Sequence, residues 1–76
     1  MKPLNTRLPL DANFTGYRTP SGEGLYCGWD SAAEKQRYYV AKWTGNDYAV
    51  YATTTDETTS LAWLAAFMRR ELPALA

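Results

Sequence analysis

Two six-residue runs separated by a four-residue turn constrain the fold of this chain more than any other feature of its sequence. The runs, Tyr38–Trp43 and Tyr48–Thr53, are rich in aromatic and β-branched side chains, which favour β-strands. Between them, Gly45 and Asn46 both tolerate the backbone conformation of a two-residue hairpin turn. The pattern therefore predicts an antiparallel hairpin that turns at these two residues.

This turn places Trp43 opposite Tyr48 and assigns alternate side chains to the two faces of the hairpin. The first face carries no charged side chain and consists of Tyr39, Ala41, Trp43, Tyr48, Val50 and Ala52. The second face includes a lysine and a threonine and consists of Tyr38, Val40, Lys42, Ala49, Tyr51 and Thr53. Because burying an unpaired charge is costly, we expect the first face to meet the core and the second to face solvent.

A cap signal and an apolar periodicity predict a helix directly after the hairpin. Thr54 and Glu57 have the spacing of a capping box, and acidic residues suit the positive end of the helix dipole. Trp63 and Phe67 widen one flank of an apolar stripe at helical spacing, and Pro73 prevents the helix from continuing. The stripe consists of Leu61, Leu64, Ala65, Met68 and Leu72. We therefore expect a helix over residues 55–72 that covers the sheet with this stripe.

The segment before the hairpin predicts shorter strands joined by turns. Phe14–Arg18 suits a short strand, the Pro- and Gly-containing run Thr19–Gly24 marks a turn, and Leu25–Trp29 alternates. Residues 1–12 contain two prolines and show neither period, so we expect an extended N-terminal arm. The predicted fold class is α+β, with an antiparallel β-meander of three or four strands over residues 13–53 and one C-terminal α-helix packed on one face. A chain of this length forms one domain.

The residue types limit the chemistry that this chain can perform. It has no histidine and one cysteine, so it lacks the commonest general base and metal ligand and can form no internal disulfide. Asp56 and Glu57 are at the helix start, and no two of the carboxylates in predicted loops have a spacing that brings them together, so no acid, base and nucleophile meet. Those loop residues are Asp11, Asp30, Glu34 and Asp47. We therefore expect no catalytic residue, no metal site, no cofactor and no enzymatic activity, and we interpret Cys27 as a small core residue.

Charge and hydropathy limit the compartment and the partners. Eight basic and eight acidic residues cancel, so the chain has no strong positive charge to attract phosphates. Residues 1–10 lack the apolar core of a signal peptide or a membrane span. We expect a soluble, cytoplasmic protein without membrane contact. A short first strand leaves a sheet edge open, so we expect a monomer or a homodimer joined through that edge.

Tyrosines are prominent on the sheet face that we expect to be exposed. Tyr26, Tyr38 and Tyr51 share this face with Val40 and Lys42, and tyrosine is enriched at protein interfaces. We expect a small non-catalytic module that binds a protein partner through these five residues, although the rings can equally serve only to shield the sheet. In size and character the chain resembles the inhibitors that phages and other mobile elements encode against host systems, anti-CRISPR proteins among them. This resemblance implies inhibition of a host protein complex.

A second resemblance implies nucleic-acid binding instead. The order of three strands and a helix over residues 24–72, with Thr55-Asp56-Glu57 at the junction, resembles the AP2 and integrase amino-terminal DNA-binding domains. Those domains present the sheet to the major groove, and the basic residues that would contact nucleic acid in this chain are Arg18, Arg37 and Lys42. Because the families carry more basic residues on the binding face than this sheet does, protein binding is the preferred hypothesis.

Overall fold

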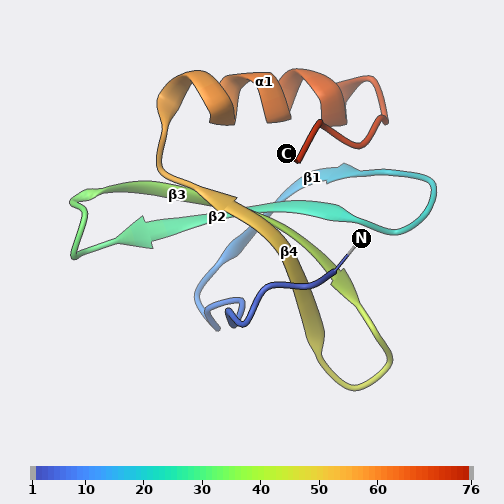
Figure 1. Ribbon diagram of the computed structural model, residues 1–76, viewed down its shortest axis with the longest axis horizontal. Coiled ribbons are helices and arrows are strands. Elements are labelled where there is room, and N and C mark those ends of the chain that lie inside the picture. Colours follow the sequence, from blue (N-terminus) through green and yellow to red (C-terminus); the bar gives the residue numbers. More distant parts are fainter. Residues whose placement is uncertain (1, 76) are drawn as a thin grey trace.

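The computed structural model describes residues 2–75 and contains four strands followed by one helix (Figure 1). The elements are β1 (Asn13–Arg18), β2 (Gly24–Asp30), β3 (Lys35–Trp43), β4 (Tyr48–Thr54) and α1 (Glu57–Met68). The strands form one antiparallel sheet in the order β1-β2-β3-β4, so each strand pairs with its neighbour in the chain. The predicted fold class, an antiparallel meander with a C-terminal helix on one face, is confirmed.

The β3–β4 hairpin has the predicted turn and, near that turn, the predicted register. The Thr44 amide donates to the Asp47 carbonyl oxygen at 2.8 Å, and Gly45 has a φ of 109°, which suits glycine. Trp43 pairs with Tyr48, as the sequence predicts.

Beyond Ala41 the hairpin contains a β-bulge. Ala41 pairs with Val50 but Val40 pairs with Ala52, so Tyr51 is an extra residue on β4. A bulge of this kind moves the following side chains to the other face of the sheet. Ala52 therefore lies on the face opposite to Ala41 and Val50, with which the sequence grouped it, and packs against the cluster that contains Trp63 and Phe67 of the helix.

The face that packs against α1, called the helix-side face, is the one that the sequence predicted to be exposed. Leu25 and Val40 form a buried cluster with Trp63 and Phe67 of the helix, and Tyr38 packs against this cluster. The prediction is wrong because it treated Lys42 and Thr53 as decisive for the whole face. Val40 is completely buried although Lys42, two residues further along β3, is partly exposed.

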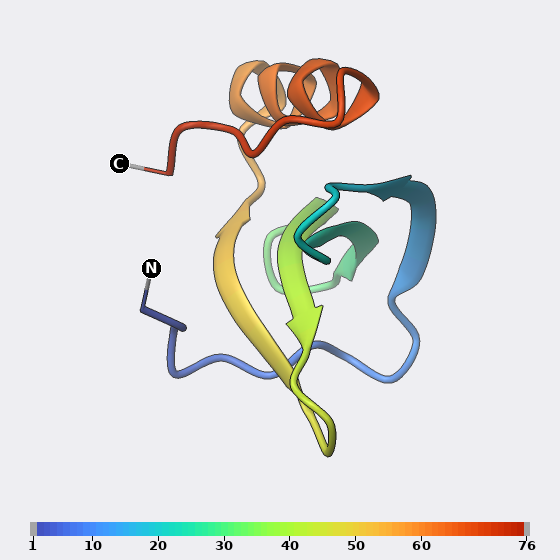
Figure 2. The ribbon, with the colours of Figure 1, turned by 90° about the vertical axis from the view of Figure 1, so that its right-hand side faces the viewer.

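The N-terminal arm covers the opposite face, called the arm-side face. Figure 2 shows α1 and the arm on opposite sides of the sheet. Leu8 and Ala12 pack against a second buried cluster, and the Leu4 amide donates to the Val50 carbonyl oxygen at 2.7 Å. The cluster consists of Tyr26, Tyr39, Ala41 and Val50. A helix therefore covers one face of the sheet, and an irregular segment covers part of the other.

The side of α1 that faces the sheet is not the predicted one. Its buried residues are Ser60, Trp63, Ala66 and Phe67. Leu61, Ala65 and Met68, which were predicted to cover the sheet, are exposed instead. Between Glu57 and Arg69 the helix carries no charged residue, so no polar side marked the direction of solvent.

The ends of α1 are also set by residues other than the predicted ones. Asp56, not Thr54, is the N-cap, and its carboxylate accepts from the Thr59 amide at 2.8 Å. The helix ends at Met68, before the predicted end, and Arg70 follows with a φ of 60°. A left-handed residue at this position is a common way to end a helix.

Candidate functional site

Four aromatic rings, one from each strand, form a continuous row on the arm-side face. The ring centroids lie 5.2 Å apart for Phe14 and Tyr26, 5.6 Å for Tyr26 and Tyr48, and 5.1 Å for Tyr48 and Trp43. These separations are typical of aromatic pairs that contact each other edge to face or at a tilt. We call Phe14, Tyr26, Trp43 and Tyr48 the aromatic row.

Two small residues allow the rings to meet. Ala41 lies on β3 between the strands of Tyr26 and Tyr48, where a larger side chain would separate the two rings. A Cβ atom at Gly24 would lie 3.1 Å from the Phe14 ring and 3.1 Å from the Tyr26 ring. The absence of a side chain at Gly24 therefore provides the space in which these rings pack.

The aromatic row is buried at one ring and open at the other three. Tyr26 is 5% exposed, whereas Phe14, Trp43 and Tyr48 are 44%, 50% and 37% exposed. The exposed rings are attached to paired strands, so their backbone is held in place before any partner arrives. The row is therefore a largely preformed apolar surface.

A positive charge lies at the Phe14 end of the row. The Cζ atom of Arg18 is 4.7 Å from the centroid of the Phe14 ring, a distance that allows a cation–π interaction. One guanidinium nitrogen donates to the Gly22 carbonyl oxygen at 3.3 Å. Among residues 2–75, no carboxylate forms an ion pair with Arg18.

The environment of Tyr26 keeps its hydroxyl group neutral. Burial raises the pKa of Tyr26, and the Tyr48 hydroxyl raises it further, while Arg18 lowers it by a smaller amount. The phenol therefore stays protonated at neutral pH. The centre of the row carries no charge, and its positive charge lies to one side.

The structure does not gather the predicted partner-binding residues on one exposed surface. Val40 is buried beneath α1, and Tyr38 and Tyr51 pack against the same cluster and are half-buried. Tyr26 is on the arm-side face, and Lys42 is on the helix-side face beside Gly22. The five residues are separated for two reasons: α1 covers the face thought to be open, and alternation along β2 places Tyr26 on the other side.

Three members of the aromatic row were not among the predicted site residues. Trp43 and Tyr48 were assigned to the core, because their face was expected to lie beneath the helix. The sequence contained one signal for these two residues: the turn register pairs Trp43 with Tyr48 directly beside an exposed turn. Phe14 could be assigned to the row only from the pairing of β1 with β2, in which it lies opposite Tyr26.

The basic residues of the nucleic-acid alternative are also separated. Arg18 lies at the aromatic row, whereas Arg37 is held by the Asp30 carboxylate at 2.8 Å and donates to Thr53 Oγ1 at 3.2 Å. Lys42 is on the opposite face of the sheet. The three charges therefore do not form a single positive surface.

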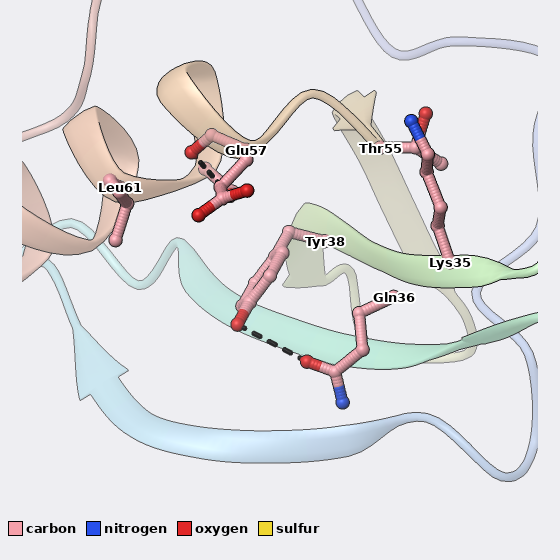
Figure 3. Close-up of a pocket in the computed structure, with 7 residues that line it drawn as sticks. Lys35, Gln36, Tyr38, Thr55, Glu57 and Leu61 are labelled. Carbon is pink, nitrogen blue, oxygen red and sulfur yellow. Dashed lines mark hydrogen bonds between the residues drawn. The ribbon is translucent and has the colours of Figure 1, made fainter.

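A shallow groove of about 430 Å³ lies between the first turns of α1 and the beginning of β3 (Figure 3). The Tyr38 hydroxyl donates to Gln36 Oε1 at 3.4 Å at one side of it. The lining residues are Lys35, Gln36, Tyr38, Thr55, Glu57, Ser60 and Leu61. They include one amine, one carboxylate and the hydroxyl groups of Thr55, Ser60 and Tyr38.

Three searches gave negative results. Within residues 2–75, no three histidine, cysteine, aspartate or glutamate side chains gather closely enough to hold a metal ion. In the described part of the chain, no helix has the length and apolar character needed to cross a membrane. Comparison of the chain with protein-family models, curated protein sequences and solved structures gave no match.

Proposed function

We propose that this chain is a small non-catalytic module that binds a protein partner through the aromatic row. The supporting observation is the contact of four rings from four strands, three of them exposed, with Arg18 beside Phe14. Tryptophan, tyrosine and arginine are the residue types that most often dominate binding energy at protein interfaces. Because the rings are held on a sheet, little conformational entropy is lost when a partner covers them.

The chemistry of the row defines the surface that complements it. Trp43 and Tyr48 suit an apolar pocket or groove, and Arg18 suits a carboxylate at the edge of that groove. We propose that the module inhibits by occupying a surface that the partner uses for another contact, the mode implied by its resemblance in size to mobile-element inhibitors. The single thiol of Cys27 suits a reducing compartment, and we propose a cytoplasmic site of action.

Protein binding agrees with this charge distribution better than nucleic-acid binding does. Exposed rings on a sheet can stack on single-stranded bases, but affinity for nucleic acid depends mainly on cations near the phosphates. Arg18 is close to the row, whereas Arg37 is paired with Asp30. The chain has a formal net charge of zero.

Matched substitutions test this proposal. Trp43→Ala and Tyr48→Ala change the row, while Trp29→Ala and Tyr17→Ala remove rings that are similarly exposed, at 65% and 36%. Trp29 shares the helix-side face with Leu25 by strand alternation, and Tyr17 lies beside Phe67 and Met68. Each variant is used to capture proteins from an extract of the native host. We expect the row variants to reduce recovery of the partner at least tenfold, and the control variants to leave it unchanged.

A photocrosslinking amino acid locates the contact directly. It is introduced at Tyr48 and, as the control, at Tyr17, and we expect a covalent adduct with the captured protein only from position 48. A mobility-shift assay at low salt with single-stranded and duplex nucleic acid tests the alternative. Equal recovery by folded row variants and wild type, or a shift that Arg18→Ala abolishes, would contradict the protein-binding proposal.

A further inference from the structure

The outward side of α1 carries an apolar stripe that nothing in the described chain covers. Leu61 and Met68 are each 59% exposed, and Ala65 between them is also exposed. The three residues are separated by four and then three positions, which is the spacing of the contact positions in paired helices. An apolar stripe on the solvent side of a helix is typical of an interaction surface. We call these three residues the helix stripe.

Charge is distributed asymmetrically between the two ends of the helix. Asp56 and Glu57 are exposed at its beginning, and Arg69 and Arg70 are exposed at its end. Arg69 forms an ion pair with Glu71 at 3.4 Å, so Arg70 supplies the net positive charge at this end. No charged residue lies between these pairs. In an antiparallel pair of such helices, the acidic end of one lies beside the basic end of the other. A parallel pair would instead bring like charges together.

We propose that two copies of this chain associate through the helix stripe, with their α1 helices antiparallel about a two-fold axis. A two-fold contact uses the same patch on both copies, and the helix stripe with its opposite charged ends is complementary to itself in this arrangement. Ala62 and Ala65 are exposed and small, so they allow the two helices to approach closely. The helix dipoles also oppose each other, which favours this orientation.

The helix stripe suits a second copy better than the sheet edge does. β1 and β4 are the edge strands. The pairing of β1 with β2 is irregular between Phe14 and Arg18. On β4, the Val50 carbonyl oxygen already accepts a hydrogen bond from the Leu4 amide. Irregular pairing and covering segments are devices that discourage edge-to-edge association. The homodimer contact is therefore placed on the helix rather than on the sheet edge expected from the sequence.

This contact is independent of the proposed partner site. The aromatic row is on the arm-side face, and α1 lies on the other side of the sheet (Figure 2). Dimerisation through α1 therefore leaves the aromatic row of each copy open. A dimer would therefore present two partner sites. Since α1 has only 12 residues, the contact is small, and we expect a dissociation constant in the micromolar range, about 1 to 100 μM.

Sedimentation equilibrium on the purified chain tests the proposal. Over concentrations from about 1 to 500 μM, wild type is expected to change from monomer to dimer. Leu61→Glu and Met68→Glu are expected to raise the dissociation constant at least tenfold. Leu10→Glu is the matched control, because Leu10 is fully exposed outside the helix and its substitution is expected to have no effect. Circular dichroism checks that each variant is folded.

Charge exchange tests the orientation without altering the helix stripe. Glu57→Lys and the double variant Arg69→Glu, Arg70→Glu are each expected to weaken self-association. When mixed, these two variants are expected to form a heterodimer, because opposite charges then meet at both ends of an antiparallel pair. A wild type that stays monomeric throughout the range overturns the proposal, and so does a dimer that the glutamate variants leave unchanged. Failure of the mixture to associate overturns the charge pairing between the two copies. Self-association of Glu57→Lys as strong as that of wild type overturns the antiparallel arrangement, because only in a parallel pair do like charges meet both before and after this change.

Discussion

The two faces of the sheet are covered by different kinds of segment. On the helix-side face, Trp63 and Phe67 of a regular helix close over Leu25 and Val40. On the arm-side face, Leu8 of an irregular arm contacts the cluster, and three rings of the aromatic row remain exposed. The difference agrees with the proposed division of roles, in which the helix-side contacts stabilise the fold and the arm-side face keeps an apolar surface for the proposed partner.

The largest expected effect is on the helix-side face. Phe67→Ala removes a fully buried ring and is expected to lower the free energy of unfolding by about 3–5 kcal/mol, enough to unfold much of the protein. Urea unfolding followed by circular dichroism measures this loss. Met68→Ala, at the next and exposed position, is the control and should change stability by less than about 0.5 kcal/mol. Similar losses from both variants would contradict the observed orientation of α1.

The next effect concerns the turn between β1 and β2, which a buried carboxylate holds. Glu23 accepts hydrogen bonds from Ser21 Oγ at 2.8 Å and from Thr19 Oγ1 at 3.2 Å. Removing hydrogen bonds to a charged group costs about 1.5–3 kcal/mol, so Glu23→Ala is expected to lose that amount in urea unfolding. Glu23→Gln retains one acceptor oxygen and should lose less.

The Glu23 carboxylate also makes the free energy of unfolding depend on pH in the acid range. Burial alone would raise the pKa of Glu23, but hydrogen bonds from Ser21, its own backbone amide and Thr19 outweigh burial and lower it. The unfolded chain therefore binds the proton more readily than the folded chain does. The stability that Glu23 contributes is present above its ordinary pKa near 4.5 and is lost as pH falls through the lower folded value. Glu23→Gln should remove this part of the acid dependence.

A smaller effect is expected from the arm. Leu8→Ala removes a half-buried side chain from the arm-side cluster and should cost about 1 kcal/mol in urea unfolding. Its ratio to the Phe67→Ala loss measures the difference between the two faces. If the two losses were equal, the arm would stabilise the fold as strongly as the helix does, and the proposed division of roles would be wrong.

The smallest effect at neutral pH concerns the tyrosine hydroxyls of the arm-side face. Burial raises the pKa of Tyr39, with Arg37 opposing the shift, and burial and Tyr48 raise the pKa of Tyr26. The stability that these neutral phenols contribute is complete below pH 10 and is lost as pH rises through their higher folded values. Tyr39→Phe should therefore change stability little at pH 7 and reduce the loss in alkali. Urea unfolding at increasing pH measures both quantities.

The sequence was sufficient to predict the meander and the hairpin turn, but not the faces that the elements present. Local signals define a turn and a helix, and Gly45 behaves as predicted. The direction in which a strand faces depends on long-range packing and on irregularities such as the Tyr51 bulge, which no local pattern marks. For α1, apolar residues on nearly every side remove the contrast that gives a helix its orientation.

The candidate site was predicted only in kind. An aromatic surface was expected, and Tyr26 is part of the one observed. Trp43 and Tyr48 were assigned to the core because Lys42 and Thr53 were taken to mark the solvent side, and Phe14 was assigned to no face. Lys42 reaches the β1–β2 turn instead, where it lies beside Gly22 and near the Glu23 carboxylate. A lysine on a buried face can place its aliphatic stem along apolar surface while its charged amine extends beyond the edge of that face.

Acrylamide quenching of tryptophan fluorescence tests the assignment of the two faces most directly. Three variants are needed, each with one tryptophan retained and the other two replaced by phenylalanine. Trp63, on the side of α1 that faces the sheet, is expected to be protected from acrylamide. Trp43 in the aromatic row should be quenched nearly as strongly as the exposed Trp29. Protection of Trp43 together with strong quenching of Trp63 would show that α1 covers the other face and would contradict the account.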